Sequence, residues 1–175
     1  MKMKPLTLAA LALAIGTAPI AAQSLQDEMA GDLAQVADKY LGLANAMAEA
    51  DYTWRPGEGV RSVGEVYMHV VSANFGFPRM RGTNPPDVDA AWLAGNAEGL
   101  DKATAEAALR ASFDHLIAFI GTVTDAQLEE EMELFGSQTN VRGYLMLVQT
   151  HLHEHLGQAI AYARTRGVVP PWSGM

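Results

Sequence analysis

Three of the chain's five histidines lie close together, in the segment HLHEHLGQ that covers residues 151–158. His151 and His155 are four residues apart, so on an α-helix their side chains lie about 40° apart around the axis and one turn apart along it. Two neutral imidazoles in this arrangement can bind the same metal ion. His153 points about 160° away from both neighbours and is expected to face solvent.

A third candidate ligand, His69, lies at the edge of the apolar face of another predicted helix, beside Val66 and Val70. If this helix faces the histidine pair, three nitrogen ligands meet and leave coordination positions open for water or substrate, as in catalytic zinc sites. The alternative is that these histidines are hydrogen-bonded core residues without a metal. His115 is expected to face solvent.

Other catalytic motifs do not match. Leu152 follows His151, so the His-Glu-x-x-His motif of zinc proteases lacks its general base. Di-iron bundles need Glu-x-x-His on two helices, whereas Glu65 precedes His69 by four residues. The sequence has no Gly-rich phosphate loop and no Gly-x-Ser-x-Gly elbow. The catalytic acid and base are therefore unknown at this stage.

Helical periodicity predicts the elements that must position these residues. Amphipathic patterns predict long helices at 24–50, 62–81, 103–122 and 139–166, with a capping box at Ser62 and Glu65. The Gly- and Pro-rich residues 82–101 form a long connection with at most a short helical turn near residue 91, and a short acidic helix begins near residue 124. No strand pattern is evident. We predict an all-α four-helix bundle.

The histidine stripe of the last helix also contains Tyr144, Gln158 and Tyr162. Gln158 lies one turn beyond His155, where it can hydrogen-bond a ligand imidazole or a water on the metal, or else satisfy a buried backbone group. Glu65, one turn before His69, is the other candidate neighbour of the ligands. Gly157 costs about 1 kcal/mol relative to Ala inside a helix, which favours close approach of another helix or of a ligand.

The N-terminus has the pattern of a secretory signal peptide. A basic start with Lys2 and Lys4 precedes an apolar run at 6–15 and small residues that end at Ala22. The apolar run is too short for a transmembrane helix. We predict cleavage after Ala22, which leaves residues 23–175 as one periplasmic domain without a membrane anchor. The alternative is an uncleaved anchor.

Charge and composition exclude several classes of partner. The chain has 12 basic and 20 acidic side chains, and loss of Lys2 and Lys4 changes its formal charge from −8 to −10. Such a chain is repelled by phosphate backbones, so nucleic acid is not expected as a partner. Cys is absent, which excludes thiolate ligands and disulfides, and any thiol chemistry needs a thiol from outside.

Two segments together resemble the DinB-like superfamily, also called the DinB/YfiT family. They are YTWRPGEGVRSVGEVYMHVVSAN at 52–74 and HLHEHLGQAIAYARTRGVVPPWS at 151–173. The shared pattern is an Arg-Pro turn, a helix with one His and a last helix with His-x-x-x-His-x-Gly-Gln. The resemblance implies a four-helix bundle with a long connection between the second and third helices, often a homodimer. It also implies a divalent metal, zinc or nickel, bound by His69, His151 and His155.

The resemblance further implies an activity. Characterised members of the family include S-transferases that use bacillithiol and a maleylpyruvate isomerase that uses mycothiol. This chain differs in its export signal and in Leu156, where many relatives carry an Arg suited to an anionic substrate. We predict a metal-dependent enzyme, of hydrolase or thiol-transferase type, that acts on an unknown small molecule. The alternative is a non-catalytic stress protein that binds metal or a small ligand.

Overall fold

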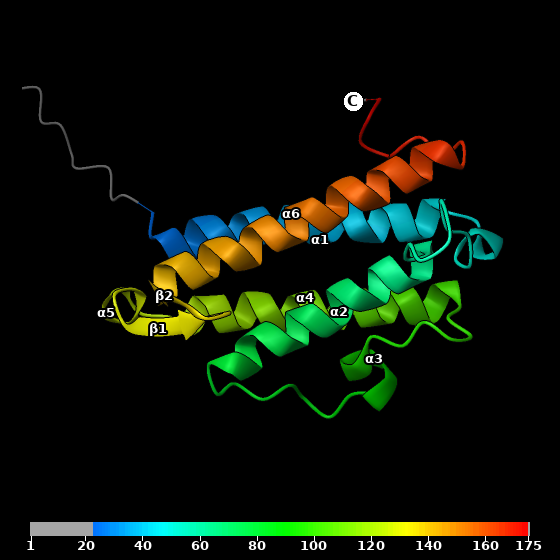
Figure 1. Ribbon diagram of the computed structural model, residues 1–175. Helices are drawn as coiled ribbons and strands as arrows, with labels where there is room; N and C mark the ends of the chain where they lie inside the picture. Colours follow the sequence, from blue (N-terminus) through cyan, green and yellow to red (C-terminus); the bar gives the residue numbers. More distant parts are fainter. Residues whose placement is uncertain (1–22, 175) are drawn as a thin grey trace, which may run out of the picture.

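The computed structural model describes residues 23–174, and these form a bundle of four long helices (Figure 1). The long helices are α1 (Leu25–Ala46), α2 (Val63–Met80), α4 (Lys102–Thr122) and α6 (Val141–Thr165). The main packed pairs are α1 with α4, α1 with α6, α2 with α4 and α2 with α6. Consequently α2 and α6 lie side by side, and the predicted four-helix bundle is confirmed. The predicted signal peptide lies outside the described residues.

Short elements join the long helices. They are the 3₁₀ helix η1 (Glu49–Asp51), α3 (Ala90–Ala94), α5 (Asp125–Leu128), β1 (Glu131–Leu134) and β2 (Ser137–Asn140). The long connection between α2 and α4 contains only α3, as the sequence predicts. None of the helices within residues 23–174 has the length and apolar character needed to cross a membrane.

Side-chain caps fix where the long helices begin. Ser24, Ser62, Asp101 and Asn140 each accept a hydrogen bond from an amide in the first turn of the helix that follows. At α2 the predicted capping box is present, because Glu65 also accepts a bond from the Ser62 amide. These bonds satisfy amides that have no partner within a helix. The capping box thus fixes the residue at which α2 begins, and with it the side of α2 on which His69 lies.

Buried tyrosines tie the helices together by donating to backbone carbonyls. Tyr40 of α1 donates to the carbonyl of Leu152 on α6 at 3.0 Å, and Tyr144 of α6 donates to the carbonyl of Phe77 on α2. Phe77 lies in the last turn of α2, where carbonyls lack partners within the helix. Because α2 carries His69 and α6 carries the other two candidate ligands, the bond from Tyr144 holds the two ligand helices together.

The prediction of a chain without strands is wrong. β1 and β2 pair as an antiparallel hairpin in which Leu134 lies opposite Ser137. Burial alternates along β1, with both glutamates exposed and with Met132 and Leu134 turned toward the protein. An alternation of only four residues is too short to distinguish a strand from a helical turn. Since β2 continues to Asn140, α6 begins at residue 141 rather than at the predicted residue 139.

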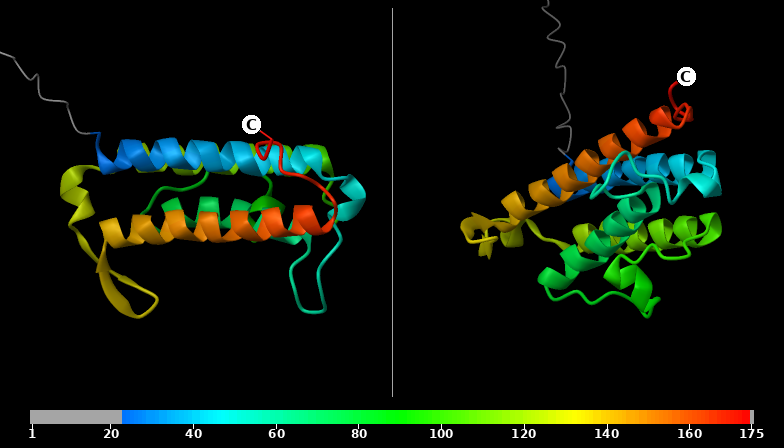
Figure 2. Two further views of the ribbon diagram at one scale, coloured as in Figure 1. Left: turned by 90° about the horizontal axis from the view of Figure 1, so that it is seen from above. Right: turned by 45° about the vertical axis from the view of Figure 1, so that its right-hand side comes forward.

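The hairpin and the segment between α1 and α2 project from the same side of the bundle, near opposite ends of α6 (Figure 2). They border the face on which α2 and α6 lie next to each other (Figure 1). Any molecule that approaches α2 and α6 from this side therefore arrives between two projecting segments.

The prediction for His115 is also wrong, and for Gly157 the structure contradicts one of the two predicted causes, the close approach of another helix. His115 is half-buried rather than solvent-facing, because its ring packs against Phe75 of α2 with ring centroids 5.5 Å apart. A Cβ added at Gly157 would meet no atom within 4 Å. No neighbouring helix of the described chain therefore requires a glycine at this position.

Phe135→Asn is expected to raise the free energy of unfolding by about 1 kcal/mol. Phe135 adopts a φ of 50° at the tip of the hairpin, a conformation that Asn tolerates better than an aromatic residue. The side chain is 81% exposed, so its loss removes little burial. Urea unfolding measures the effect, with Met146→Gln as a control at another exposed apolar residue. A lower midpoint for Phe135→Asn than for the control would contradict the assignment of strain.

Candidate metal centre

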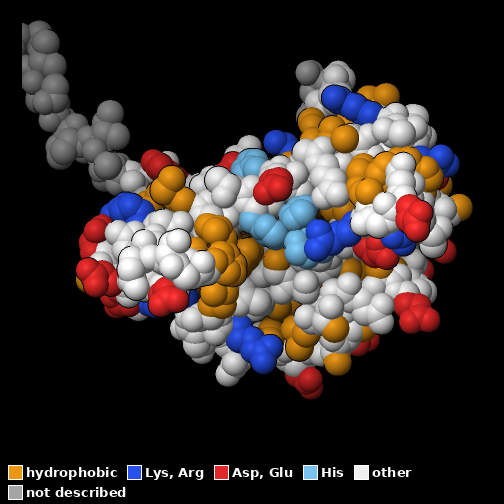
Figure 3. All heavy atoms as spheres, viewed as in Figure 1, with side chains coloured by type: hydrophobic (Ala, Val, Ile, Leu, Met, Phe, Trp, Pro, Cys, Tyr) orange, Lys and Arg blue, Asp and Glu red, His pale blue; other side chains and the backbone are white. Residues whose placement is uncertain are grey.

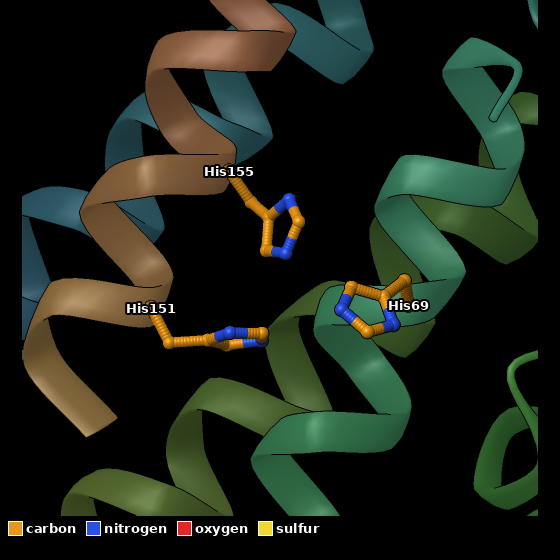
Figure 4. Close-up of side chains that lie close together, drawn as sticks. All are labelled: His69, His151 and His155. Atoms are coloured by element: carbon orange, nitrogen blue, oxygen red, sulfur yellow. The ribbon is translucent and has the colours of Figure 1, made fainter. Parts of the chain in front are cut away.

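Three histidine side chains converge between α2 and α6 (Figure 4). His69 comes from α2, and His151 and His155 come from successive turns of α6. One ligand nitrogen of each lies within 4.8 Å of those of the other two. The ring centroid of His155 is 4.6 Å from that of His69 and 4.6 Å from that of His151. The structure thus brings together the three residues that the sequence analysis selected as ligands.

The donor set fits a divalent metal ion. Nε2 of His151 is buried and has no hydrogen-bond partner among the described residues. A buried polar atom without a partner is uncommon in proteins and costs about 1–3 kcal/mol. Three imidazole nitrogens are among the donor sets that catalytic zinc sites use. One ion held by all three residues would give the unpaired nitrogen of His151 its partner.

The protonation state of the cluster also suits metal binding. Burial, together with smaller contributions from the positive charge of Arg61 and from the two other histidines, lowers the pKa of His69 to about 4. Burial likewise lowers the pKa of His151, with a contribution from His155. Both imidazoles are therefore neutral at pH 7, which is the form that binds a metal.

Gln158 sets the tautomer of His155. Nε2 of Gln158 donates to the hydroxyl of Tyr162 at 2.9 Å, which leaves Oε1 facing Nδ1 of His155 at 2.8 Å. An amide oxygen only accepts, so His155 donates from Nδ1 and keeps the lone pair of Nε2 free. A partner of this kind orients a metal-binding imidazole and raises its basicity.

Tyr162 connects this chain of hydrogen bonds to the turn after α1. Its ring packs edge-on against Trp54, with centroids 5.5 Å apart. The guanidinium of Arg166 lies over the Trp54 ring, 5.5 Å from its centroid, and Nε of Arg166 donates to Asp51 at 2.8 Å. The segment between α1 and α2 therefore holds Tyr162, and through it Gln158, in place.

Two other residues predicted near the ligands have different partners. Glu65 accepts from the Ser62 amide at 2.7 Å and from Arg55 at 2.9 Å. Among the described residues no hydrogen bond joins Glu65 to the three histidines, so its role is to stabilise the start of α2. Tyr144 reaches the site indirectly, because it packs edge-on against Phe77, whose ring lies 5.4 Å from that of His151.

His153 points away from the cluster, as predicted. Its Nε2 lies 2.7 Å from a carboxylate oxygen of Asp32 on α1, which also accepts from Gln149 at 2.8 Å. These contacts join α6 to α1 on a different side of α6.

A pocket of about 390 Å³ opens beside His69 and His151. Its other lining residues come from α2, α6 and the hairpin tip, and they are Ala73, Phe77, Phe135, Leu147, Thr150 and Glu154. Figure 3 shows histidine side chains at the surface of this face, with hydrophobic side chains gathered toward the hairpin and basic side chains on the opposite side. A small molecule can therefore reach the histidines from solvent.

Glu154 is a candidate functional residue that the sequence analysis did not select. Its carboxylate is the one acidic group that lines the pocket, and it takes part in none of the ion pairs among the described residues. Glu154 follows His151 by three residues, a spacing that places both on one side of a helix. The His-Glu-x-x-His motif requires Glu directly after the first His and so does not detect it.

The comparisons with known proteins agree on one family. The family model described as the DinB superfamily matches residues 32–159. No curated protein matches this chain.

Three solved structures share the fold. The DinB-like protein YjoA from Bacillus subtilis is 18% identical, with a TM-score of 0.64 over 81% of this chain and 93% of its own. A DinB-like protein from Bacillus cereus is 16% identical, with a TM-score of 0.68 over 83% and 95%. YfiT from Bacillus subtilis is 19% identical, with a TM-score of 0.66 over 87% and 94%, and is described as a probable metal-dependent hydrolase with an unusual four-helix bundle topology. At these identities the likeness shows the fold alone.

Gln158→Leu is expected to weaken zinc binding by roughly 10- to 100-fold. The substitution removes the acceptor that orients His155 while leaving all three candidate ligands present. Competition with a chromophoric zinc chelator measures the affinity. Gln149→Leu, on the same helix and bonded to Asp32, is the matched control. Equal zinc affinities for the two variants would refute the role given to Gln158.

The metal-free protein is expected to lose stability as the pH falls from about 6.5 toward about 4. The pKa of His69 is about 4 in the folded chain, below the ordinary value of 6.5 for a histidine in an unfolded chain. Between these values the unfolded chain binds more protons, so the free energy of unfolding falls with the pH, whereas above 6.5 this residue contributes no pH dependence. Urea unfolding in the presence of a chelator measures the slope. In His69→Gln the free energy of unfolding should fall less steeply with decreasing pH than in the wild type. Parallel curves of the free energy of unfolding against pH for the two proteins would contradict the expectation.

Proposed function

This chain belongs to the DinB superfamily, and from that premise we propose that it is a metal-dependent enzyme whose divalent ion is held by His69, His151 and His155. The observation that carries the proposal is the convergence of these imidazoles beside a pocket, with one buried nitrogen left unpaired. The description of YfiT as a probable metal-dependent hydrolase supports it. Imidazole ligands suit zinc or nickel.

The residues in and around the pocket have different chemical roles in this proposal. Held by the nitrogens of His69, His151 and His155, a divalent ion would supply Lewis acidity, which lowers the pKa of a bound water or thiol toward neutral pH. Gln158 holds His155 in the tautomer that leaves Nε2 free. Glu154 lines the same pocket, where its carboxylate would serve as the proton acceptor. Phe77 and Leu147 shield one side of the reacting atoms from water.

We favour hydrolysis over thiol transfer. Leu156 is buried and carries no charge, so it offers nothing to an anionic thiol at the position where many relatives have Arg. The chain has no Cys of its own. Export through residues 1–22, which we also propose, would place the protein where low-molecular-weight thiols are scarce and water is the available nucleophile. The substrate is then a small molecule with a hydrolysable bond.

A second candidate function is non-catalytic binding of metal or of a small ligand. The observation that favours it is the scarcity of acid–base groups, since Glu154 is the one carboxylate among the residues that line the pocket. In that case the same histidines hold an ion that serves structure or transport.

Metal analysis tests the ligand set. The mature protein, purified without a His tag, is expected to contain about one divalent ion per chain by mass spectrometry. His69→Ala and His151→Ala should lose the ion, whereas His153→Ala, on the same helix and paired with Asp32, should keep it. A protein that holds no ion, or that keeps it in His69→Ala, would overturn the proposal.

Hydrolysis assays with the metal-loaded protein then separate the two functions. With a panel of ester, amide and lactone substrates, Glu154→Gln is expected to retain the ion but to lower kcat/KM by about 100-fold or more, because the proton acceptor is lost. Asp32→Asn, at a carboxylate outside the pocket, is the matched control. A metal-loaded protein that hydrolyses nothing in the panel would favour the binding function instead.

A further inference from the structure

The tip of the hairpin carries an aromatic residue, Phe135, at a position where this type of turn favours a small polar residue. Phe135 and Gly136 have φ values of 50° and 79°, so both central residues of this two-residue turn lie in the left-handed region, as in a type I′ turn. Such turns prefer Asn or Asp followed by Gly. Phe135 is strained there and is 81% exposed. Neither the geometry of the turn nor the packing of the core accounts for it.

The position of Phe135 relative to the histidines offers an explanation. Phe135 lines the same pocket of about 390 Å³ as His69 and His151, although it comes from a different element. Phe77 of α2 and Leu147 of α6 also line the pocket, and the ring of Phe77 lies 5.4 Å from that of His151. An apolar wall thus extends from the hairpin tip to the imidazoles, in agreement with the hydrophobic side chains between hairpin and histidines in Figure 3.

We propose that Phe135, Phe77 and Leu147 bind an apolar group of the substrate. The substrate class is then a small molecule in which an aromatic or branched aliphatic group is attached directly to the group that reacts at the histidines. The volume of the pocket suits a molecule of this size. The inference rests on the proposed function for the reacting group and extends it to the adjoining part of the substrate.

Of the three residues that form this wall, Phe135 has the most apolar surface left to bury when a ligand binds, because its side chain is exposed. Phe77 is already buried and Leu147 is half-buried in the free protein. Phe135 is the residue whose ring still faces water, so an apolar group placed against it removes the largest apolar surface from solvent. A strained residue that persists at a pocket, rather than in the core, is consistent with a role in binding.

Two hydroxamates of different size test the inference in the zinc-loaded protein. Both bind metal through the same head group, but acetohydroxamate ends in a methyl group and benzohydroxamate in a phenyl ring. By calorimetry, the wild type is expected to bind benzohydroxamate about tenfold more tightly than acetohydroxamate. Phe135→Asn, which suits the turn and is not expected to unfold, should reduce this ratio to about threefold or less without changing the metal content. Met146→Gln, at an exposed residue of α6 that does not line the pocket, should keep the ratio of the wild type.

Other results would overturn the inference. One such result is that both proteins hold zinc while Phe135→Asn keeps the wild-type ratio of benzohydroxamate affinity to acetohydroxamate affinity. In that case the hairpin tip does not bind the apolar group and the inference is wrong, whereas the proposed function stands. If Phe135→Asn instead changes the sedimentation coefficient, a second copy of the chain covers Phe135, and the inference is wrong.

A protein without metal would refute the proposed function and calls for a different probe. Benzyl alcohol has the ring but no metal-binding head group. If it shifts the NMR amide signal of Gly136 in the wild type but not in Phe135→Asn, the apolar site exists independently of the metal. Absence of that shift in the wild type overturns the inference as well.

Discussion

The contact between α2 and α6 is the constraint on which the candidate site depends. His69 belongs to one helix and His151 and His155 to the other, so the cluster exists only while the two helices keep their spacing and rotation. The hydrogen bond from Tyr144 to the Phe77 carbonyl and the edge-on packing of their rings join the helices about two turns away from His151 and His69. The bundle thus fixes the distance between ligands that are 82 or more residues apart in the chain.

Burial of the histidines opposes the stability of the metal-free protein and at the same time suits metal binding. Removing imidazoles from water disfavours their charged form and lowers the pKa of His69 and His151. It also leaves Nε2 of His151 without a partner. Both features are unfavourable for a metal-free core and favourable for a metal ligand, which must be neutral and must keep a free lone pair. Burial of the many apolar side chains in the rest of the core offsets this cost.

The surroundings of the cluster differ from one side to the other. Toward the hairpin the pocket is lined mainly by apolar side chains, with Phe135 at its outer edge. On the other side the segment before α2 brings Arg61 close enough for its charge to lower the pKa of both His69 and His151. Arg61 is exposed and takes part in none of the ion pairs within residues 23–174. A molecule at the histidines therefore has an apolar environment at one end and a positive one at the other.

Local spacing in the sequence determined the features that depend on one helix alone. The helical repeats, the capping box at Ser62 and Glu65, and the placement of His151, His155 and Gln158 on one side of α6 all follow from 3.6 residues per turn and can be predicted without a structure. The tertiary structure decided what depends on contacts between elements. It placed His69 against the pair on α6, packed the half-buried ring of His115 against Phe75, and left Gly157 without a close neighbour. It also added Glu154 and the strained Phe135 to the pocket. The hairpin has two strands of only four residues, and the position of the hairpin and the angle between α2 and α6 are set by packing between segments far apart in the sequence. A local sequence pattern does not encode such packing.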